Sequence, residues 1–406
     1  MNHLITGLDV GSAQIKCVVA ERRRDGNLSL LSVAKIPSAG VRKGVFVDVE
    51  AATSVLRDLA LDLKKISRKA TQNVFVSMNT EHMRPRSSRG IAVVARADQE
   101  IQDDDVDRVN QASQAVKLAP NYLALHNIIR EYFVDEVGDI LDPRGMTGNR
   151  LEVSTLILET FAPQVNLLLK TLGRVGFRVA GPIFNPLASA EAILSKRQKD
   201  LGVLLVDFGF GTTSLVAYEE SKVVHARSIP VGSGYITNDI AIGLKTSVDV
   251  AEKLKVAFGS AISREVSRRD TVNLTDVDAS AEGEVSRRFL AEIIEVRLAE
   301  TLGFVQEELK TVGRDIQLPG GVVITGGGAK LANITDLVKQ ELKLPVQLGF
   351  PNVGIFDIMN PAHEELLDDT EFSTAVGLVL WGSKQEESAF SNPVGALKSF
   401  LKNLIP

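Results

Sequence analysis

Two segments of this 406-residue chain share one layout: a strand, an aspartate at its end, a glycine turn and a second strand. The later segment runs from Val203 to Val216 and contains Asp207, Gly209 and Gly211. The four apolar residues before the aspartate suit a strand that is buried on both faces, and glycine lets the backbone turn and approach a ligand closely. Taken alone, this turn is better interpreted as an ordinary hairpin in which Asp207 only fixes the turn.

The same layout occurs earlier, between Gly7 and Ala20, where Asp9 is followed by Gly11 and Ser12. Such a repeat favours two related halves that face a shared cleft. The second half adds a glycine-rich turn between Gly321 and Leu331, which we expect to open a helix whose N-terminus favours anions or close backbone approach. Turns of this kind offer amide N–H groups to phosphate, and a carboxylate can hold a metal through water. The three turns together therefore predict a phosphate-binding site.

The composition narrows the class of protein. Apolar residues make up 44% of the chain and charged residues 24%, as in ordinary globular proteins, and the net charge of −5 disfavours a nucleic-acid partner. Cys17 is the single cysteine, so an intramolecular disulfide is excluded and we expect this residue to pack as a small apolar side chain in a reducing cytosol. Five histidines and one cysteine form no zinc-type cluster. The sequence shows no signal peptide and no apolar run long enough to span a bilayer.

The three turns resemble those of a known superfamily. Asp9-x-Gly11-Ser12-x-x-x-Lys16, the DFGFGTT turn and the TGGGA turn are similar to the two phosphate loops and the adenosine loop of the actin-like ATPases. The resemblance implies an α/β actin-like fold, in which two ribonuclease-H-like halves with inserted small subdomains surround a cleft for ATP and Mg²⁺. It implies that Asp9 and Asp207 hold Mg²⁺ through water. The residues that it implies for phosphate or nucleoside contacts are Gly11, Ser12, Ala13, Lys16, Gly209, Gly211, Thr212, Thr213, Gly234, Glu252, Lys255, Gly326, Gly327 and Gly328.

Some of these positions have competing interpretations. Asn185 precedes Pro186 at the predicted start of a helix, where capping explains both residues, but actin-like ATPases often have a Glu or Gln here that orients the attacking water. A neutral Asn185 can orient water but cannot take its proton, so we expect slow hydrolysis at most, with Asp207 as the other catalytic candidate. Glu252 and Lys255 lie three residues apart on a predicted helix. They form either an exposed ion pair that adds little to the stability of the fold or, by the resemblance, a contact with adenosine.

A family-specific segment lies between residues 81 and 160. REYFVDE, followed after a short gap by DPRGMTGNRLEV, resembles the subdomain peculiar to the FtsA family of bacterial cell-division proteins. The residues alone predict an inserted α/β subdomain in this segment. The division that the resemblance implies is 1–80 and 161–200 for the first half, 81–160 for the insertion, 201–240 and 318–382 for the second half, 241–317 for its small subdomain, 383–391 for a polar linker and 392–406 for a terminal helix.

A long helix is predicted from Val285 to about Gly313, with a buried stripe of apolar residues. The stripe comprises Phe289, Ile293, Val296, Leu302, Val305, Leu309 and Val312. Within this helix LAEIIEVR resembles FtsA sequences, and in that family the small subdomain binds the acidic and hydrophobic tail of FtsZ. The resemblance makes Arg297 the first candidate contact and Arg287 and Arg288 weaker ones. Alternatively, Arg297 is an exposed arginine with no specific role.

The C-terminal segment, which follows the predicted linker Ser383 to Ser391, is expected to form an amphipathic helix. Its apolar face comprises Val394, Leu397, Phe400, Leu401, Leu404 and Ile405, with Lys398 and Lys402 on the opposite face. At ~1.5 Å per residue the helix is too short to cross a bilayer, but it suits an anionic membrane interface, where each lysine contributes about 1 kcal/mol. The alternative is a terminal helix docked on the protein's own core. FtsA proteins have a membrane-targeting helix in this place, so the resemblance favours the membrane.

The resemblance to FtsA extends along nearly the whole chain. It implies a peripheral protein at the division septum, on the cytoplasmic face of the membrane, that polymerises, binds ATP as a structural switch, tethers FtsZ filaments and contacts other division proteins. Two alternatives remain. A PilM-like scaffold of type IV pilus assembly shares the fold, although the terminal helix argues against it. A small-molecule kinase of the same fold needs a dedicated base near the γ-phosphate, and the sequence offers none beyond Asp207.

Overall fold

The computed structural model describes residues 3–279, 281–312 and 318–391. By their internal contacts these residues form two compact units. The first unit comprises the described residues of Met1–Met78, Leu167–Leu194 and Gly349–Pro406, and the second unit those of Asn79–Asn166 and Ser195–Leu348. This grouping differs from the predicted division, because the described chain beyond Gly349 packs with the first half and the inserted segment is grouped with the second.

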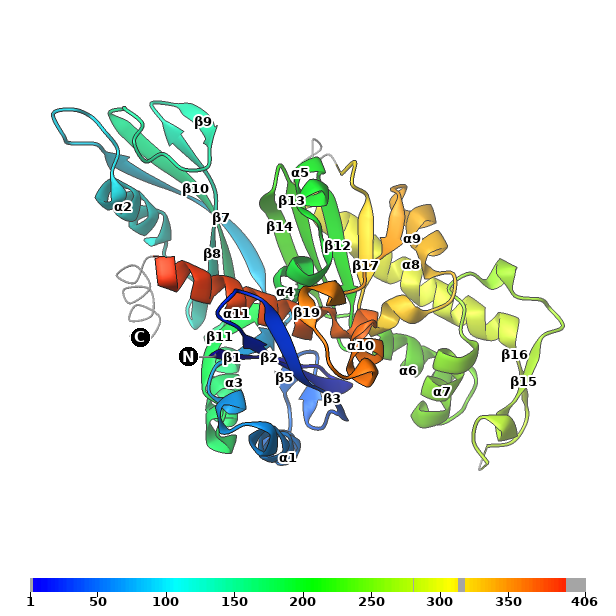
Figure 1. Ribbon diagram of the computed structural model, residues 1–406. Coiled ribbons are helices and arrows are strands. Elements are labelled where there is room, and N and C mark those ends of the chain that lie inside the picture. The colour runs from blue at the N-terminus through cyan, green and yellow to red at the C-terminus, as the bar shows by residue number, and fades with distance from the viewer. Residues whose placement is uncertain (1–2, 280, 313–317, 392–406) are drawn as a thin grey trace. The chain divides into compact units, whose positions relative to one another are not determined.

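A six-stranded sheet forms the centre of the first unit (Figure 1). In spatial order its strands are β11 (Val179–Phe184), β6 (Val74–Met78), β1 (His3–Val10), β2 (Gln14–Arg22), β3 (Leu28–Pro37) and β19 (Phe356–Asp357). β1, β2 and β3 are antiparallel neighbours, whereas β6 runs parallel to β1 and β11 parallel to β6. Seven of the eight residues of β1 are buried, as expected of a strand covered on both faces.

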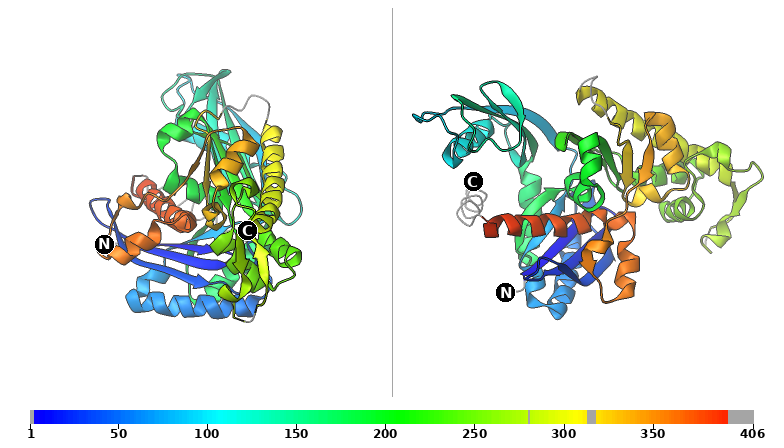
Figure 2. Two further views of the ribbon diagram at one scale, coloured as in Figure 1. Left: turned by 90° about the vertical axis from the view of Figure 1, so that its right-hand side faces the viewer. Right: turned by 45° about the horizontal axis from the view of Figure 1, so that its top comes forward.

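Helices cover both faces of this sheet. They are α1 (Val49–Ile66), most of α3 (Ala162–Val175), α4 (Asn185–Ile193), α10 (Pro361–Leu367) and α11 (Ser373–Ser391), and a short β4–β5 hairpin (Val41–Arg42, Val45–Phe46) precedes α1. α1 and α11 lie on opposite sides of the strands (Figure 2, left; α1 light blue, α11 red). α11 packs on β1 and on α4, and Gly377 is required there because a Cβ would lie 1.8 Å from the carbonyl oxygen of Ala188. Glycine at this position therefore lets α11 approach α4 closely.

The helix α11 also corrects the predicted linker. Residues Ser383 to Ser391 continue the helix instead of forming a polar linker. The segment contains no glycine or proline, and its Lys, Gln, Glu and Ala residues are good helix formers, so the helix runs through to Ser391. The predicted membrane helix, 392–406, lies outside the described residues. Across the described parts of the chain, no helix combines the length and the apolar composition needed to cross a bilayer.

The central sheet of the second unit repeats the strand order of the first (Figure 1). In spatial order its strands are β14 (Lys222–Ile229), β13 (Thr213–Glu219), β12 (Val203–Phe208), β17 (Val322–Thr325) and β18 (Val346–Leu348). β12, β13 and β14 are antiparallel neighbours, while β17 and β18 continue in parallel from β12. The series β14-β13-β12-β17-β18 thus corresponds to β3-β2-β1-β6-β11, which confirms the repeat predicted from the two aspartate turns.

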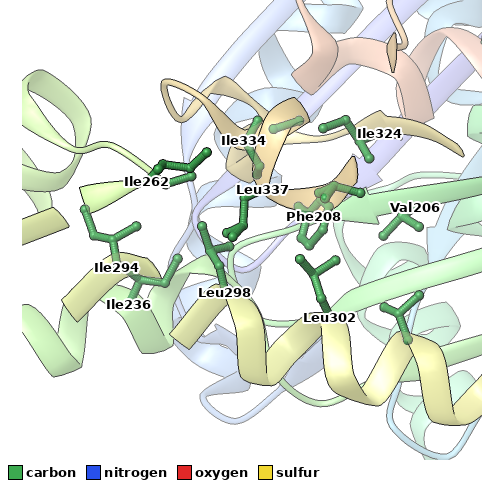
Figure 3. Packing of buried hydrophobic residues seen from close by; sticks show 14 of the residues in the cluster. Val206, Phe208, Ile236, Ile262, Ile294, Leu298, Leu302, Ile324, Ile334 and Leu337 are labelled. Atoms are coloured by element: carbon green, nitrogen blue, oxygen red, sulfur yellow. The ribbon is translucent and has the colours of Figure 1, made fainter. Parts of the chain in front are cut away.

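The central sheet of the second unit packs against helices in an apolar cluster to which β12 and β17 contribute (Figure 3). The helices of this part are α5 (Lys196–Leu201), α6 (Ser233–Gly243), α7 (Val248–Phe258), α8 (Arg287–Val312) and α9 (Ile334–Leu342). A two-stranded β15–β16 sheet (Thr271–Asn273, Glu284–Ser286) lies between α7 and α8 in the sequence. Leu298 and Leu302 of α8 are buried in this cluster together with Phe208 of β12 and Ile324 of β17. The strand that carries Asp207 is therefore anchored by the central part of α8.

The buried face of α8 differs in its first half from the predicted stripe. Leu302 and Val305 are buried as predicted, whereas Phe289 and Val296 are 46% and 71% exposed. The buried positions nearby are instead Leu290, Ile294 and Leu298. Adjacent apolar residues occur twice in this stretch, at 289–290 and at 293–294, so periodicity allows two neighbouring faces. Packing against the rest of the second unit buries the face that carries Leu290, Ile294 and Leu298, which is not the face that the sequence predicted.

The inserted segment is a separate small sheet with one helix, as predicted. Its antiparallel strands, in spatial order, are β7 (Arg84–Val93), β10 (Arg150–Phe161), β8 (Tyr122–Val134) and β9 (Val137–Ile140). The helix α2 (Asp103–Gln114) packs on β7 and β10 (Figure 1). A cluster of buried apolar residues joins the helix to the sheet, so the insertion has a core of its own.

Candidate functional site

The turn after Asp207 lies in the second unit. Asp207 is the penultimate residue of β12, is buried, and pairs in register with Thr325 of β17. Residues 209–212 turn the chain into β13, which begins at Thr213, and both Thr212 and Thr213 are buried. The predicted strand, turn and strand are therefore confirmed. The carboxylate stands at the end of a buried parallel strand pair, where loops can surround it.

Two further loops pack around this turn. The backbone amides of Ser233 and Gly234, at the start of α6, donate to the carbonyl oxygens of Gly209 and Phe210 at 2.9 and 2.8 Å. The third loop begins at Gly326, directly after β17. Segments from β12, α6 and β17 thus converge beside Asp207.

Gly326 lies against the carboxylate of Asp207. Its φ is +85°, and a Cβ at this position would lie 2.3 Å from Asp207 Oδ1 and 2.8 Å from the carbonyl oxygen of Phe208. Only glycine fits both the conformation and the space. Gly327–Lys330, which include Gly328, form a single 3₁₀ turn, whereas the sequence predicted that the glycines open a longer helix. The longer helix, α9, begins only at Ile334, because the chain leaves the helical conformation first, with Asn333 left-handed at φ 63°.

Lys255 is buried next to the start of α6. Its Nζ donates to Glu252 Oε2 at 2.6 Å, to Thr237 Oγ1 at 2.9 Å and to the carbonyl oxygen of Ser233 at 3.3 Å. It also lies 5.4 Å from the centre of the Phe210 ring. Burial lowers the pKa of Lys255, and the neighbouring Glu252 carboxylate partly offsets that effect. The interpretation of Glu252 and Lys255 as an exposed ion pair is therefore wrong, because only 6% of the lysine side chain is exposed.

Asn79 is a polar residue at this site that the sequence did not identify. Its Nδ2 donates to Thr212 Oγ1 at 2.9 Å and to Ser214 Oγ at 3.2 Å. It follows β6 directly, and a single asparagine after a strand has the sequence signature of an ordinary turn. The one signal that could have found it is its place at the end of the strand that follows the first aspartate hairpin.

In the first unit, Asp9 and Lys16 form a buried ion pair. Lys16 Nζ lies 3.5 Å from Asp9 Oδ2, and their side chains are 12% and 8% exposed. The turn between β1 and β2 is closed by the Gly11 amide, which donates to the Gln14 carbonyl oxygen at 3.1 Å. Ser12 Oγ accepts from the amide of Gly44, in the β4–β5 hairpin, at 3.2 Å. Ala13 accepts through its carbonyl oxygen from the amide of residue 38 at 3.0 Å. Asp9 belongs to the first unit and Asp207 to the second, so the shared cleft stays a prediction.

Each aspartate turn has one buried carboxylate, which fits a magnesium ion held mainly by other ligands. Asp9 Oδ1 is buried and has no hydrogen-bond partner within the described ranges. No group of three or more His, Cys, Asp or Glu side chains in those ranges is placed to hold a metal ion. Mg²⁺ commonly keeps several waters and is bound by one or two carboxylates plus substrate phosphates. The donor set therefore suits Mg²⁺ delivered with a phosphate ligand better than a metal that the protein cages alone.

Asn185 does not cap the helix that follows it. Asn185 is the first residue of α4, Pro186 is the second, and Phe184 occupies the cap position without a side-chain hydrogen bond. The Oδ1 atom of Asn185 is buried and lacks a partner in the described part of the chain. The capping interpretation is wrong because the helix begins one residue earlier than the sequence predicted. Orienting a water molecule is the interpretation that remains.

Arg297 is already paired within the protein. Its Nε and Nη2 donate to the two carboxylate oxygens of Asp239 at 2.5 and 3.1 Å, and Glu300 is a further partner. The hydrogen bond with Asp239 raises the pKa of Arg297 above its ordinary value. Arg287 donates to the carbonyl oxygen of residue 258 at 3.1 Å, and Arg288 lies 3.5 Å from a glutamate one turn further along α8. The interpretation of Arg297 as an exposed side chain without a specific role is therefore wrong.

Two family models match the chain. The model of the cell division protein FtsA matches residues 204–377, and the model of the SHS2 domain inserted in FtsA matches residues 82–158. The cell division protein FtsA of Pseudomonas aeruginosa is 32% identical, over 96% of this chain and 92% of its own length. That of Borreliella burgdorferi is 33% identical over 95% and 92%, and that of Bacillus subtilis 31% identical over 93% and 83%.

Solved structures of lower identity show the fold. A chain of the PilM–PilN type IV pilus biogenesis complex has a TM-score of 0.62 and 18% identity, over 93% of this chain and 98% of that one. MreB5 of Spiroplasma citri bound to ADP has a TM-score of 0.58 and 14% identity over 96% and 99%, and the same protein bound to AMPPNP has 0.56 and 14% over 97% and 99%. The predicted actin-like fold is confirmed. From the two family models and the full-length relatives we conclude that this chain belongs to the FtsA family of cell-division proteins.

Proposed function

We propose that this chain binds ATP with Mg²⁺ as a structural switch and tethers FtsZ filaments to the cytoplasmic face of the membrane at the division septum. The observation that carries the proposal is the cluster around Asp207. A glycine turn, a glycine without room for a side chain and the buried Lys255 all belong to one unit of the structure. The MreB5 relatives, solved with ADP and AMPPNP, have the same fold and support a nucleotide as the ligand.

The two aspartate turns are assigned to the phosphates. In the second unit the hydroxyls of Thr212 and Thr213 and the amides of residues 209–213 are the donors, since turns of this kind bind anions through their N–H groups. In the first unit Ser12 and the ammonium group of Lys16 have the same role. Asp9 and Asp207 are assigned to Mg²⁺ through water, which neutralises much of the phosphate charge when it is bound.

The nucleoside is assigned to the lysine network of α6 and α7. Glu252 is partly exposed, at 38% of its side chain, and uses Oε2 for Thr237 and Lys255. Its second oxygen is the acceptor that we assign to a ribose hydroxyl. Lys255 holds the carboxylate in place, because a buried ammonium group with three oxygen acceptors leaves little freedom of rotation. Gly326, Gly327 and Gly328 let the backbone approach the adenosine.

Hydrolysis is expected to be slow. Asn185 offers a buried carbonyl oxygen that can accept a hydrogen bond from water, but an amide cannot remove its proton. We therefore expect a turnover below about one per second, the low edge of typical enzymes. A steady-state phosphate-release assay with the purified chain measures this, and a clearly faster rate contradicts the assignment. A small-molecule kinase would instead transfer the γ-phosphoryl group of ATP to a sugar or to acetate, which yields ADP and the phosphorylated acceptor without release of inorganic phosphate.

Nucleotide binding is tested with Asp207→Ala in isothermal titration with MgATP. We expect the variant to lose measurable binding, because it removes the carboxylate around which the three loops converge. Asp62→Ala is the matched control, since Asp62 is exposed on α1 and pairs with Lys65 at 2.6 Å. It should bind as the wild type does. An affinity of Asp207→Ala equal to that of the wild type removes the role of Asp207.

The FtsZ tail is assigned to the surface of α8 and the end of α6. Phe289 and Val296 are exposed on α8 beside Arg297, and Ile242 of α6 is 75% exposed. The two helices meet here, because a Cβ on Gly243 would lie 2.7 Å from a side-chain atom of Ile293. Apolar side chains next to an arginine suit a tail that is both acidic and hydrophobic. Asp239 competes with the tail for Arg297, so the peptide has to share or displace that ion pair.

A fluorescent FtsZ tail peptide tests this surface. Val296→Asp should weaken binding at least about tenfold, because it places a negative charge among the apolar contacts of an acidic peptide. Val93→Asp is the control, since Val93 is 69% exposed but lies on β7 of the inserted sheet. Equal affinity of Val296→Asp and the wild type would exclude the α8 surface. Binding of a pilus inner-membrane peptide instead of the FtsZ tail would favour the PilM-like alternative.

The membrane contact is assigned to residues 392–406, for which the sequence is the support. A single short amphipathic helix binds an anionic surface weakly, so filaments that link many chains raise the avidity without a new contact. Sedimentation with anionic and neutral liposomes, with and without residues 392–406, tests this assignment. We expect binding to need both the tail and anionic lipid, and to increase when MgATP promotes self-assembly. Unchanged sedimentation of the truncated chain would contradict the assignment.

A further inference from the structure

Asn79 connects the phosphate turn of the second unit to the start of the inserted subdomain. It is the first residue after β6, and its amide Nδ2 reaches Thr212 Oγ1 at 2.9 Å and Ser214 Oγ at 3.2 Å. Thr212 is the last residue of the turn and Ser214 the second of β13, and both are buried. Asn79 and Thr212 are 133 positions apart in the sequence.

The direction of these hydrogen bonds determines what Thr212 can do. The amide nitrogen of asparagine only donates, so both hydroxyl oxygens accept from Asn79. The hydroxyl proton of Thr212 is therefore left to donate elsewhere, which is the role that a phosphate oxygen requires. Hydrogen bonds in a chain polarise one another, so accepting from Asn79 also makes the hydroxyl a better donor.

The amide oxygen of Asn79 gives a second, independent indication that this side chain has a function. Its Oδ1 is buried and finds no hydrogen-bond partner among the described residues. Buried polar atoms are normally paired, and a functional role is one of the explanations for an exception. Valine or serine would avoid the unpaired carbonyl oxygen, so the amide nitrogen is the part of the side chain that the site needs.

The inserted subdomain is fastened to the same strands that leave the turn. Arg130 of β8 donates to the carbonyl oxygens of Val223 and Val224 of β14 at 3.0 and 2.6 Å. Arg227 of β14 donates to the carbonyl oxygen of Met83, just before β7, at 3.1 Å. β14 pairs with β13 along its length, and β13 begins at the turn. The base of the insertion is therefore attached by hydrogen bonds to backbone atoms of a strand that pairs with β13.

We propose that Asn79 is a positioning residue that directs the hydroxyl of Thr212 towards the nucleotide phosphate and couples occupancy of the turn to the inserted subdomain. The proposal rests on the nucleotide binding proposed above. If Asn79 has this role, the insertion changes when the turn in the second unit binds nucleotide. A purely structural role for Asn79 would affect folding stability alone.

Three variants test the first part in titrations with MgATP. Asn79→Asp has the same shape, but its carboxylate accepts from Thr212 and withdraws the hydroxyl proton from the phosphate. We expect a loss of affinity of about 10- to 100-fold, the range for a hydrogen bond to a charged group. Asn79→Ala leaves the hydroxyl free but undirected and should lose about threefold. Asn127→Asp, an exposed site on β8 of the insertion, is the charge control and should bind as the wild type does.

The order of the affinities decides the first part. If Asn79→Asp binds MgATP more weakly than Asn79→Ala does, the result supports a directed Thr212 hydroxyl. Equal affinities, or the reverse order, overturn this part of the proposal. Unfolding midpoints of all variants are measured alongside. If Asn79→Ala does not fold, Asn79→Val replaces it, because valine also lacks a hydrogen-bond donor but fills more of the space.

Hydrogen exchange with and without saturating MgATP tests the coupling. In the wild type we expect protection both in residues 203–216 and in residues 82–158 of the insertion. In Asn79→Ala the turn should stay protected while the change in the insertion is lost. Persistence of that change in the variant, or its absence from the wild type when the turn is protected, overturns the coupling. No protection of the turn in the wild type would instead refute the proposed nucleotide binding itself.

Discussion

Replacing Gly326 by alanine should damage the structure and the proposed ligand site together. Gly326 has φ +85° and ψ 174°, a region that is essentially open to glycine alone, and an alanine Cβ would lie 2.3 Å from Asp207 Oδ1. Backbone strain of this kind is worth about 1–3 kcal/mol, and the overlap forces the buried carboxylate to move. We take about 3 kcal/mol as the loss of local stability, which corresponds to a roughly 100-fold increase in the opening equilibrium.

Amide hydrogen exchange in β17, the strand that ends at Gly326, measures this opening. We expect exchange in Val322–Thr325 to be roughly 100-fold faster in Gly326→Ala, with loss of MgATP binding. Gly303→Ala is the matched control, because Gly303 lies inside α8 and an added Cβ there meets no atom within 4 Å. That change should stabilise the helix by about 0.5–1 kcal/mol. Wild-type exchange and nucleotide binding in Gly326→Ala would refute the assignment of Gly326 as the required neighbour of Asp207.

Three further predictions concern the core and the buried titratable groups. Leu302→Ala should lower the free energy of unfolding by about 2–5 kcal/mol, measured by urea denaturation, because Leu302 is fully buried between α8 and β12. A hydrogen bond from His225 lowers the pKa of Glu308 below 4.5. The stability that Glu308 contributes is therefore present above about pH 4.5 and is lost as the pH falls through the lowered pKa. Glu308→Gln should flatten this part of the pH dependence of stability. Burial raises the pKa of Cys17 to about 12, so a thiol reagent at neutral pH should label the chain only after unfolding.

The elements that local sequence determines were predictable. The strand Val179–Phe184, the helix Ile334–Leu342 and the strand Val346–Leu348 are elements of this kind. Each is bounded by a turn or a change of periodicity that acts over a few residues. The two aspartate turns belong to the same class, since a buried strand, a glycine turn and a second strand are all visible within about fourteen residues.

The features that depend on tertiary packing were not predictable in the same way. The buried face of α8 was chosen by what surrounds it, because Phe289 and Leu290 are equally apolar. Asn185 lost its capping role through a shift of one residue in the start of α4, which lies within the uncertainty of any helix boundary read from sequence. Asn79 has no signature until the chain brings it to Thr212, 133 positions away.

The residue that pairs with the aspartate across each hairpin differs between the two turns. Lys16 is the register partner of Asp9 on β2, and Ser214 is the register partner of Asp207 on β13. Lys16 forms a buried ion pair with its aspartate at 3.5 Å, whereas Ser214 accepts a hydrogen bond from Asn79. The first turn therefore has a cation at the position that pairs with its aspartate, and the second turn has a neutral hydroxyl there.

This difference predicts that the first turn is the more sensitive to loss of charge. Lys16→Met leaves the carboxylate of Asp9, of which 8% is exposed, without its cation, and breaking a buried pair in this way costs about 3 kcal/mol. The double variant Asp9→Asn with Lys16→Met removes both charges and should recover most of the stability, measured by urea denaturation, but not MgATP binding. If the double variant were as unstable as Lys16→Met alone, the loss would arise from packing of the lysine stem and not from the unpaired charge. Recovery of stability without recovery of nucleotide affinity would instead separate the two roles of Lys16, as a counter-ion within the fold and as a phosphate ligand.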